Sequence, residues 1–117
     1  MDSSHALTSL SALAHDRRLA IFRLLVKTGP GGLAAGAIAR KLDTAPNTLS
    51  AQLLILSNAG LVRAKREGRS IIYAVEFEAM GALLLFLTKD CCGGRPEICA
   101  PLAQTVNACC PPGKRRA

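Results

Sequence analysis

The sequence has no tryptophan, and aromatic residues make up only 3% of its 117 residues. A core with so few aromatics must consist of Leu, Ile, Val and Ala, and this composition favours helices. Half of the residues are apolar, which excludes a chain that is disordered beyond its ends. A chain of this length is expected to form one domain with an ordinary hydrophobic core.

Long hydrophobic runs are also missing, since the longest is the six residues from Ala82 to Leu87. A membrane-spanning helix needs about 18 or more apolar residues, so no membrane partner is expected. The first 15 residues lack the basic region of a secretion signal, and Ser and Thr interrupt their apolar residues. We therefore expect a cytoplasmic protein, in which thiols stay reduced.

Cysteine is absent from the first 90 residues. The stretch DCCGGRPEICAPLAQTVNACC, residues 90 to 110, holds all five thiols: Cys91, Cys92, Cys99, Cys109 and Cys110. Five is an odd number for a disulfide framework, and clustered thiols in a reducing compartment indicate metal or redox chemistry. The sequence therefore predicts a domain at residues 1–89 followed by a cysteine-rich tail at residues 90–117 that carries metal or redox chemistry.

The net charge of +7 is unevenly distributed along the chain. Residues 61 to 75 contain four basic residues and one acidic residue, and form the densest positive segment. Its cations are Arg63, Lys65, Arg66 and Arg69. Phosphate is the natural partner of such a patch, although a solvated hairpin that happens to be basic would show the same pattern.

Hydrophobic periodicity predicts helices at residues 4–14, 17–27, 33–42, 46–59 and 76–89. Asp16 has the residue type and position of an N-cap for the second helix. The predicted core stripes are Leu7, Leu10, Leu13 and Ala14 in the first helix, Leu19, Phe22, Leu25 and Val26 in the second, Leu49, Leu53 and Leu56 in the fourth, and Phe77, Met80, Leu84 and Leu87 in the last. Two strands, 61–66 and 69–75, form a hairpin through Glu67 and Gly68.

The fourth and the last of these helices have distinctive surfaces. Pro46 suits the first position of the fourth helix, because a proline there loses no helical hydrogen bond. The outer side of that helix is mainly polar, with Asn47, Thr48, Ser50, Ala51 and Asn58. The last helix is apolar on most sides and must bury more than one surface, so we expect a partner subunit to cover it.

A short helix, a turn and a second helix with a polar outer face form a helix-turn-helix, whose second helix enters the DNA major groove. The basic hairpin behind it would act as a wing against phosphates or the minor groove. We therefore predict binding of double-stranded operator DNA through Asn47, Thr48, Ser50, Ala51, Gln52, Arg63, Lys65, Arg66 and Arg69. The competing interpretation is that the helix pair serves only for packing.

The segments HDRRLAIFRLL, GAIARKLDTAPNTLSAQLLILSNAGLV and REGRSIIYAV resemble the ArsR/SmtB family of winged-helix metalloregulatory repressors. The resemblance covers residues 6 to 89. It implies a mainly α fold with a small β-hairpin, a winged helix-turn-helix of order α-α-α-α-β-β-α. It also implies a homodimer joined through the first and last helices, which needs no cofactor to bind DNA and is released by an inducer metal.

The chain departs from the family in its recognition helix. Where the family has Ser-x-His-Leu and a basic residue, this sequence has Ser50-Ala51-Gln52-Leu53 followed by Leu54. Gln52 can still donate and accept at a base edge. Leu54 cannot hold a phosphate, so the sequence leaves open which bases are read.

The resemblance also limits where an inducer can bind. The family's Cys-x-Cys site in the first helix of the helix-turn-helix is absent, because residues 33–42 contain no Cys. Its Asp and His site on the last helix is absent as well, because residues 76–89 contain neither residue. The cysteine tail remains, and it resembles the arrangement in members that respond to trivalent arsenic or antimony.

Thiolate chemistry agrees with such an inducer, since soft ligands select soft ions. As(III) or Sb(III) takes three sulfurs in a neutral complex, which costs far less to bury than the net negative charge of a zinc tetrathiolate. Cys99 can complete either adjacent pair, Cys91 and Cys92 or Cys109 and Cys110. The sequence does not decide between the two pairs, or whether two subunits share the site.

Three alternatives accompany this prediction. A zinc-type divalent ion could occupy the thiols, although the chain lacks a Cys-x-x-Cys pair. Oxidation of adjacent thiols could act as a redox switch. A thiol metallochaperone or sequestration protein is a different class of function, in which the basic hairpin would be incidental. We expect no enzyme, because no Cys has a nearby His or a phosphate-cradling loop to activate it.

Overall fold

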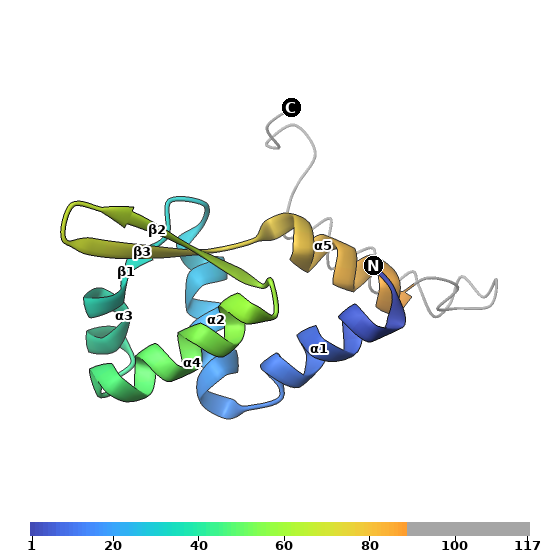
Figure 1. The fold of residues 1–117 in the computed structure, drawn as a ribbon, viewed down its shortest axis with the longest axis horizontal. Helices are drawn as coiled ribbons and strands as arrows, with labels where there is room; N and C mark the ends of the chain where they lie inside the picture. The colour runs from blue at the N-terminus through green and yellow to red at the C-terminus, as the bar shows by residue number, and fades with distance from the viewer. Residues whose placement is uncertain (89–117) are drawn as a thin grey trace. The chain divides into compact units, whose positions relative to one another are not determined.

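The computed structural model describes residues 1–88, and Met1–Phe86 forms a compact unit. The elements follow one another as α1 (Ser3–Leu13), α2 (Asp16–Thr28), β1 (Leu33–Ala34), α3 (Ala35–Lys41), α4 (Pro46–Asn58), β2 (Val62–Glu67), β3 (Ser70–Val75) and α5 (Phe77–Thr88) (Figure 1). The predicted order of five helices with a hairpin before the last one is confirmed. The five cysteines lie outside the described residues, and the predicted domain boundary after residue 89 stays a prediction.

The second helix begins differently from the sequence prediction. Asp16 is its first residue and not its N-cap. The N-cap is His15, whose backbone is extended and whose Nδ1 accepts hydrogen bonds from the backbone N–H groups of Arg17 (3.2 Å) and Arg18 (3.4 Å). An imidazole nitrogen here performs the function that Asp or Ser usually performs at a helix start.

The turn between α3 and α4 is fixed by two residues. Asp43 has a φ of 49°, a left-handed conformation that Asp and Asn adopt more readily than most residues. The buried Thr44 donates its hydroxyl to the carbonyl of Leu42 (3.1 Å). Pro46 then starts α4, as its sequence position predicted.

The sheet has three strands and not two. The short strand β1 pairs antiparallel with β3, with Leu33 opposite Tyr73 and Ala34 opposite Ile72. The predicted helix at 33–42 therefore starts two residues later than expected, because its first residues are extended. Gly32 makes this pairing possible, since its φ is +74° and a Cβ at that position would lie 2.4 Å from the carbonyl oxygen of Tyr73.

The hairpin turn is displaced by one residue from its predicted place. Glu67 pairs with Ser70, so the two turn residues are Gly68 and Arg69. Gly68 has a φ of +61° and Arg69 does not have a positive φ. This is the pattern of a type II′ turn, which requires Gly at its first central position and matches the twist of the paired strands.

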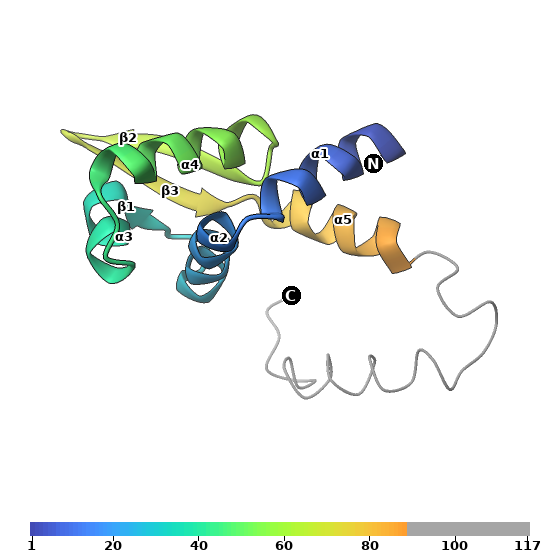
Figure 2. The same ribbon diagram turned by 90° about the horizontal axis from the view of Figure 1, so that it is seen from below.

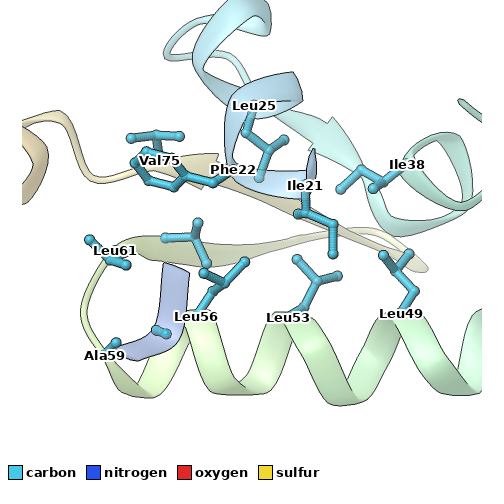
Figure 3. Packing of buried hydrophobic residues seen from close by; sticks show 12 residues of the cluster. Ile21, Phe22, Leu25, Ile38, Leu49, Leu53, Leu56, Ala59, Leu61 and Val75 are labelled. Carbon is cyan, nitrogen blue, oxygen red and sulfur yellow. The ribbon is translucent and has the colours of Figure 1, made fainter. Parts of the chain in front are cut away.

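The core lies between α4, α2 and one face of the sheet (Figure 3). Leu49, Leu53 and Leu56 point from α4 toward the sheet and are at most 2% exposed, as predicted from their spacing. They meet Ile21 and Phe22 of α2. The core is closed by the fully buried side chains of Leu25, Ile38, Leu61 and Val75.

The predicted stripes of α1, α2 and α5 are partly wrong. In α1 the buried side is formed by Ala6, Ser9 and Ala12, while Leu7 is 66% exposed. The other predicted core residues that are exposed are Leu10, Ala14, Leu19, Leu84 and Leu87. Helices α1 and α5 both lie at the end of the unit that is far from the hairpin (Figures 1 and 2).

Candidate nucleic-acid interface

The first two turns of α4 expose a row of small, mainly polar side chains. Of the predicted base-reading residues, Asn47, Thr48, Ser50 and Ala51 are exposed, and Gln52 is partly buried. Because Leu49, Leu53 and Leu56 fix the inner face of the same helix, the outer face cannot rotate away from solvent. The N-terminal half of α4 therefore presents an exposed, mainly polar surface of the kind that enters a major groove.

Two arginines at the start of α2 hold this helix-turn-helix in place. The Nη1 of Arg17 donates to the hydroxyl of Thr44 (2.7 Å), immediately before α4 begins. The Nη1 of Arg18 donates to the Oε1 of Gln52 (2.8 Å), and its Nε donates to the carbonyl of Ala12 (2.6 Å). The sequence did not predict this role for either arginine. Thr44 is 27 residues from Arg17 and Gln52 is 34 residues from Arg18, and no local pattern connects them.

Three of the four wing cations lie on β2, and they divide between the two faces of the hairpin. Residues alternate along β2, so Val62, Ala64 and Arg66 share the face that covers the core, and Arg63 and Lys65 lie on the other. Arg63 forms an ion pair with Glu76 (3.0 Å), and Lys65 forms one with Glu67 (3.7 Å). Arg63 and Lys65 line a depression together with Pro30, Gly31 and Ile72.

Arg66 and Arg69 are placed differently. Neither forms an ion pair with any residue of the described part of the chain. Arg66 lies on the core-covering face, beyond the end of the core, and Arg69 is in the turn at the tip. In both views the wing tip and the N-terminal end of α4 lie at the same end of the unit (Figures 1 and 2). These two arginines are therefore the wing cations best placed beside a duplex that α4 enters.

The described residues contain no metal cluster. Residues 1–88 include no group of three or more His, Cys, Asp or Glu side chains close enough to hold an ion. The predicted thiol ligands Cys91, Cys92, Cys99, Cys109 and Cys110 all lie outside the described residues. Among the described helices, none combines the length and the hydropathy that a membrane crossing requires.

Comparison with known proteins agrees with this geometry. A helix-turn-helix domain family model matches residues 13–64. The biofilm growth-associated repressor of Agrobacterium fabrum is 35% identical over 75 residues, which are 64% of this chain and 62% of that protein.

Two solved structures have the same fold. Reduced HlyU from Vibrio cholerae has 28% sequence identity and a TM-score of 0.61, over 77% of this chain and 92% of that one. The second is Mb0332 from Mycobacterium bovis, described as a homodimeric winged helix-turn-helix DNA-binding domain of a possible ArsR-family regulator. It has 33% identity and a TM-score of 0.61, over 71% of this chain and 75% of that one. The chain therefore belongs to the winged helix-turn-helix transcriptional regulators, and its structural neighbours include ArsR-family regulators.

Proposed function

We propose that the protein is a homodimeric transcriptional repressor that binds operator DNA through α4 and the wing. The observation that carries this proposal is the exposed polar face of α4 at the same end of the unit as the unpaired cations Arg66 and Arg69. The exposed face of the helix supplies base contacts, and the flanking cations supply phosphate contacts. The predicted contacts from Asn47 to Gln52 belong to the same proposal. Arg63 and Lys65 stay a prediction from the sequence, and the proposal does not require them, because they lie on the other face of the hairpin.

The homodimer is supported by the surface of α1 and α5. Leu7 and Leu85 are 66% and 72% exposed, and Leu10 adds a third large apolar side chain on α1. Large apolar side chains exposed on a helix favour an association site, and in the proposed dimer a second copy of the chain covers them. Mb0332, which shares this fold, is homodimeric. Two copies of α4 would then meet two half-sites of a palindromic operator.

Repression is the proposed direction of regulation. The resemblance to ArsR/SmtB repressors favours it, as does the similarity to the biofilm growth-associated repressor. HlyU of Vibrio cholerae, which also resembles this chain, is a transcriptional activator. A reporter gene placed behind an operator that the protein binds distinguishes repression from activation. The proposal expects lower expression of the reporter when the protein is present, whereas an activator would raise expression.

We further propose that As(III) or Sb(III) bound by tail thiols releases the DNA. Three thiols react with the trihydroxide of the ion. Each element–oxygen bond is replaced by a bond to sulfur, and the thiol proton leaves with the hydroxide as water. No oxidant is consumed. The support is the donor set, since five thiols lie within 20 residues and soft ions prefer thiolates. Cys99 is the proposed common ligand.

The inducer is tested by DNA release from the reduced protein. Arsenite and antimonite are titrated against the complex with labelled operator, with Zn²⁺ as the divalent comparison. The expected result is release by either oxyanion, and loss of that response in Cys99→Ser with DNA affinity unchanged. If neither oxyanion releases the DNA, the metalloid proposal is wrong. If Cys99→Ser still releases the DNA normally, the ion is bound by the two adjacent cysteine pairs alone.

Thiol oxidation is a second candidate for the signal. One solved structure of HlyU from Vibrio cholerae is described as reduced. Adjacent cysteines can close to a disulfide, with two electrons and two protons passing to an oxidant such as a peroxide. Release by peroxide that dithiothreitol reverses, without release by arsenite, would favour this candidate. Metalloid binding without salt-sensitive DNA binding would instead favour a sequestration protein.

A further inference from the structure

Gln52 of α4 does not present its whole side-chain amide to solvent. The Nη1 of Arg18 lies 2.8 Å from its Oε1, and both side chains are partly buried. A guanidinium has only donors, so the amide atom that faces it must be the oxygen. The amide NH2 is therefore the end directed away from Arg18, and the orientation of the carboxamide is fixed by chemistry.

Arg18 is itself anchored on a third helix. Its Nε donates to the carbonyl of Ala12 (2.6 Å), one of the last carbonyls of α1, which have no partner within their own helix. A cation at a helix C-terminus is also favoured by the helix dipole. Arg18 thus has two hydrogen-bonded ends, one on α1 and one on α4, and it holds Gln52 at a defined position.

We propose that Arg18 is a positioning residue that makes Gln52 read guanine in preference to adenine. This inference rests on the proposed binding of operator DNA by α4. A free Gln pairs with adenine by accepting from N6 and donating to N7. In this protein the guanidinium charge beside Oε1 disfavours a second donor there, because the hydrogens of the adenine amino group carry partial positive charge. The exposed NH2 is left to donate to acceptors, and guanine presents two in the major groove, N7 and O6.

The position of Gln52 allows this contact. It follows Thr48 by one helical turn, so the two side chains are neighbours along α4, and Thr48 is exposed. Gln52 lies on the flank of the helix that faces α2, which explains why Arg18 reaches it while its far end remains accessible. The base contacted by Gln52 would therefore lie at the edge of the α4 footprint nearest to α2.

The test is a comparison of base preference between variants. The operator of the wild-type protein is selected from a random duplex library, and duplexes with guanine or adenine at each position of the half-site are then titrated. Gln52→Ala identifies the position that Gln52 reads. At that position we expect wild type to prefer guanine by about tenfold, within the range for a good base contact. In Arg18→Met the preference should fall to about threefold or less, since the freed oxygen can accept from adenine.

Arg17→Met is the matched control. It removes the same charge from the adjacent residue and breaks a contact to Thr44, but it leaves Gln52 untouched. It should weaken affinity for guanine and adenine duplexes equally. In a Gln52→Ala background, Arg18→Met should have no effect on base preference, because the effect of Arg18 acts through Gln52.

A second variant keeps the inference testable if Arg18→Met does not fold. Gln52→Glu retains an acceptor for Arg18 but has no NH2, so it should lose the guanine preference and keep its thermal stability. An unchanged guanine preference in either Arg18→Met or Gln52→Glu would overturn the inference and leave the proposed function intact. Failure of the wild-type protein to select any sequence would overturn both.

Discussion

The position of the wing cations leads to a quantitative prediction about salt dependence. Arg66 and Arg69 lie beside the α4 end of the unit without ionic partners among the described residues, whereas Arg63 and Lys65 lie on the opposite face and pair with glutamates. We compare two double variants that each remove two positive charges. One combines Arg66→Ala and Arg69→Ala, and the other combines Arg63→Ala and Lys65→Ala. Only the first pair is expected to remove phosphate contacts.

The magnitude follows from counterion release. Each phosphate neutralised on duplex DNA contributes about 0.9 to the slope of log affinity against log salt. Loss of two contacts per subunit lowers the slope by about 1.8, or about 3.6 for a homodimer. Between about 50 and 200 mM salt, a fourfold change, each lost contact removes roughly a 3.5-fold salt effect. The variant without Arg66 and Arg69 should therefore bind more weakly at low salt and be much less sensitive to added salt.

The assay is fluorescence anisotropy of a labelled operator duplex at a series of KCl concentrations. The variant without Arg63 and Lys65 serves as the control for net charge, and its slope should stay within about one unit of the wild-type value. Equal reductions of slope in the two double variants would refute the reasoning. That result would mean that the total charge of the wing, and not the face on which each cation lies, determines binding.

Three further predictions concern stability and assembly. Gly32→Ala should destabilise the domain by about 1–3 kcal/mol, because it places a side chain at positive φ against a backbone carbonyl. Gly31→Ala is the control and should change the melting temperature little, because nothing lies within 4 Å of its new Cβ. Ser9→Ala should raise the free energy of unfolding, measured in denaturant, by about 1 kcal/mol, since the buried Ser9 hydroxyl has no hydrogen-bond partner among the described residues. A free energy of unfolding below that of the wild type would show that the hydroxyl is hydrogen-bonded. Leu85→Glu should convert the dimer to monomer in sedimentation experiments, while Leu54→Glu, which adds the same charge at an exposed leucine of α4, should leave the dimer intact. Dimers in both variants would exclude α5 from the interface.

The sequence predicted the fold where local chemistry determines it. The apolar spacing of Leu49, Leu53 and Leu56 defined the inner face of α4, and Pro46 defined its start. The Gly of the hairpin located the turn to within one residue, since only pairing across strands decides whether Gly68 is its first or second residue. These features depend on residues within a turn or two of one another.

Features that depend on distant contacts were not predicted. Leu33 and Ala34 continue a helical pattern but are extended, because β3 offers them a hydrogen-bonded partner 38 residues or more away. In α1 the sequence gives no reason to bury Ala6 and Ser9 in place of larger apolar side chains. The contact of Arg18 with Gln52 also depends on tertiary packing, and it changes which half of the amide is available to DNA.

The central claim is that the protein releases a specific operator when tail thiols capture a soft ligand. Its most direct test is one titration of the reduced protein on its selected duplex, followed by stepwise addition of arsenite. The account predicts saturable, salt-sensitive binding with wild-type protein, release by arsenite, and no release from Cys99→Ser. Binding that arsenite, antimonite and oxidant all leave unchanged would contradict it.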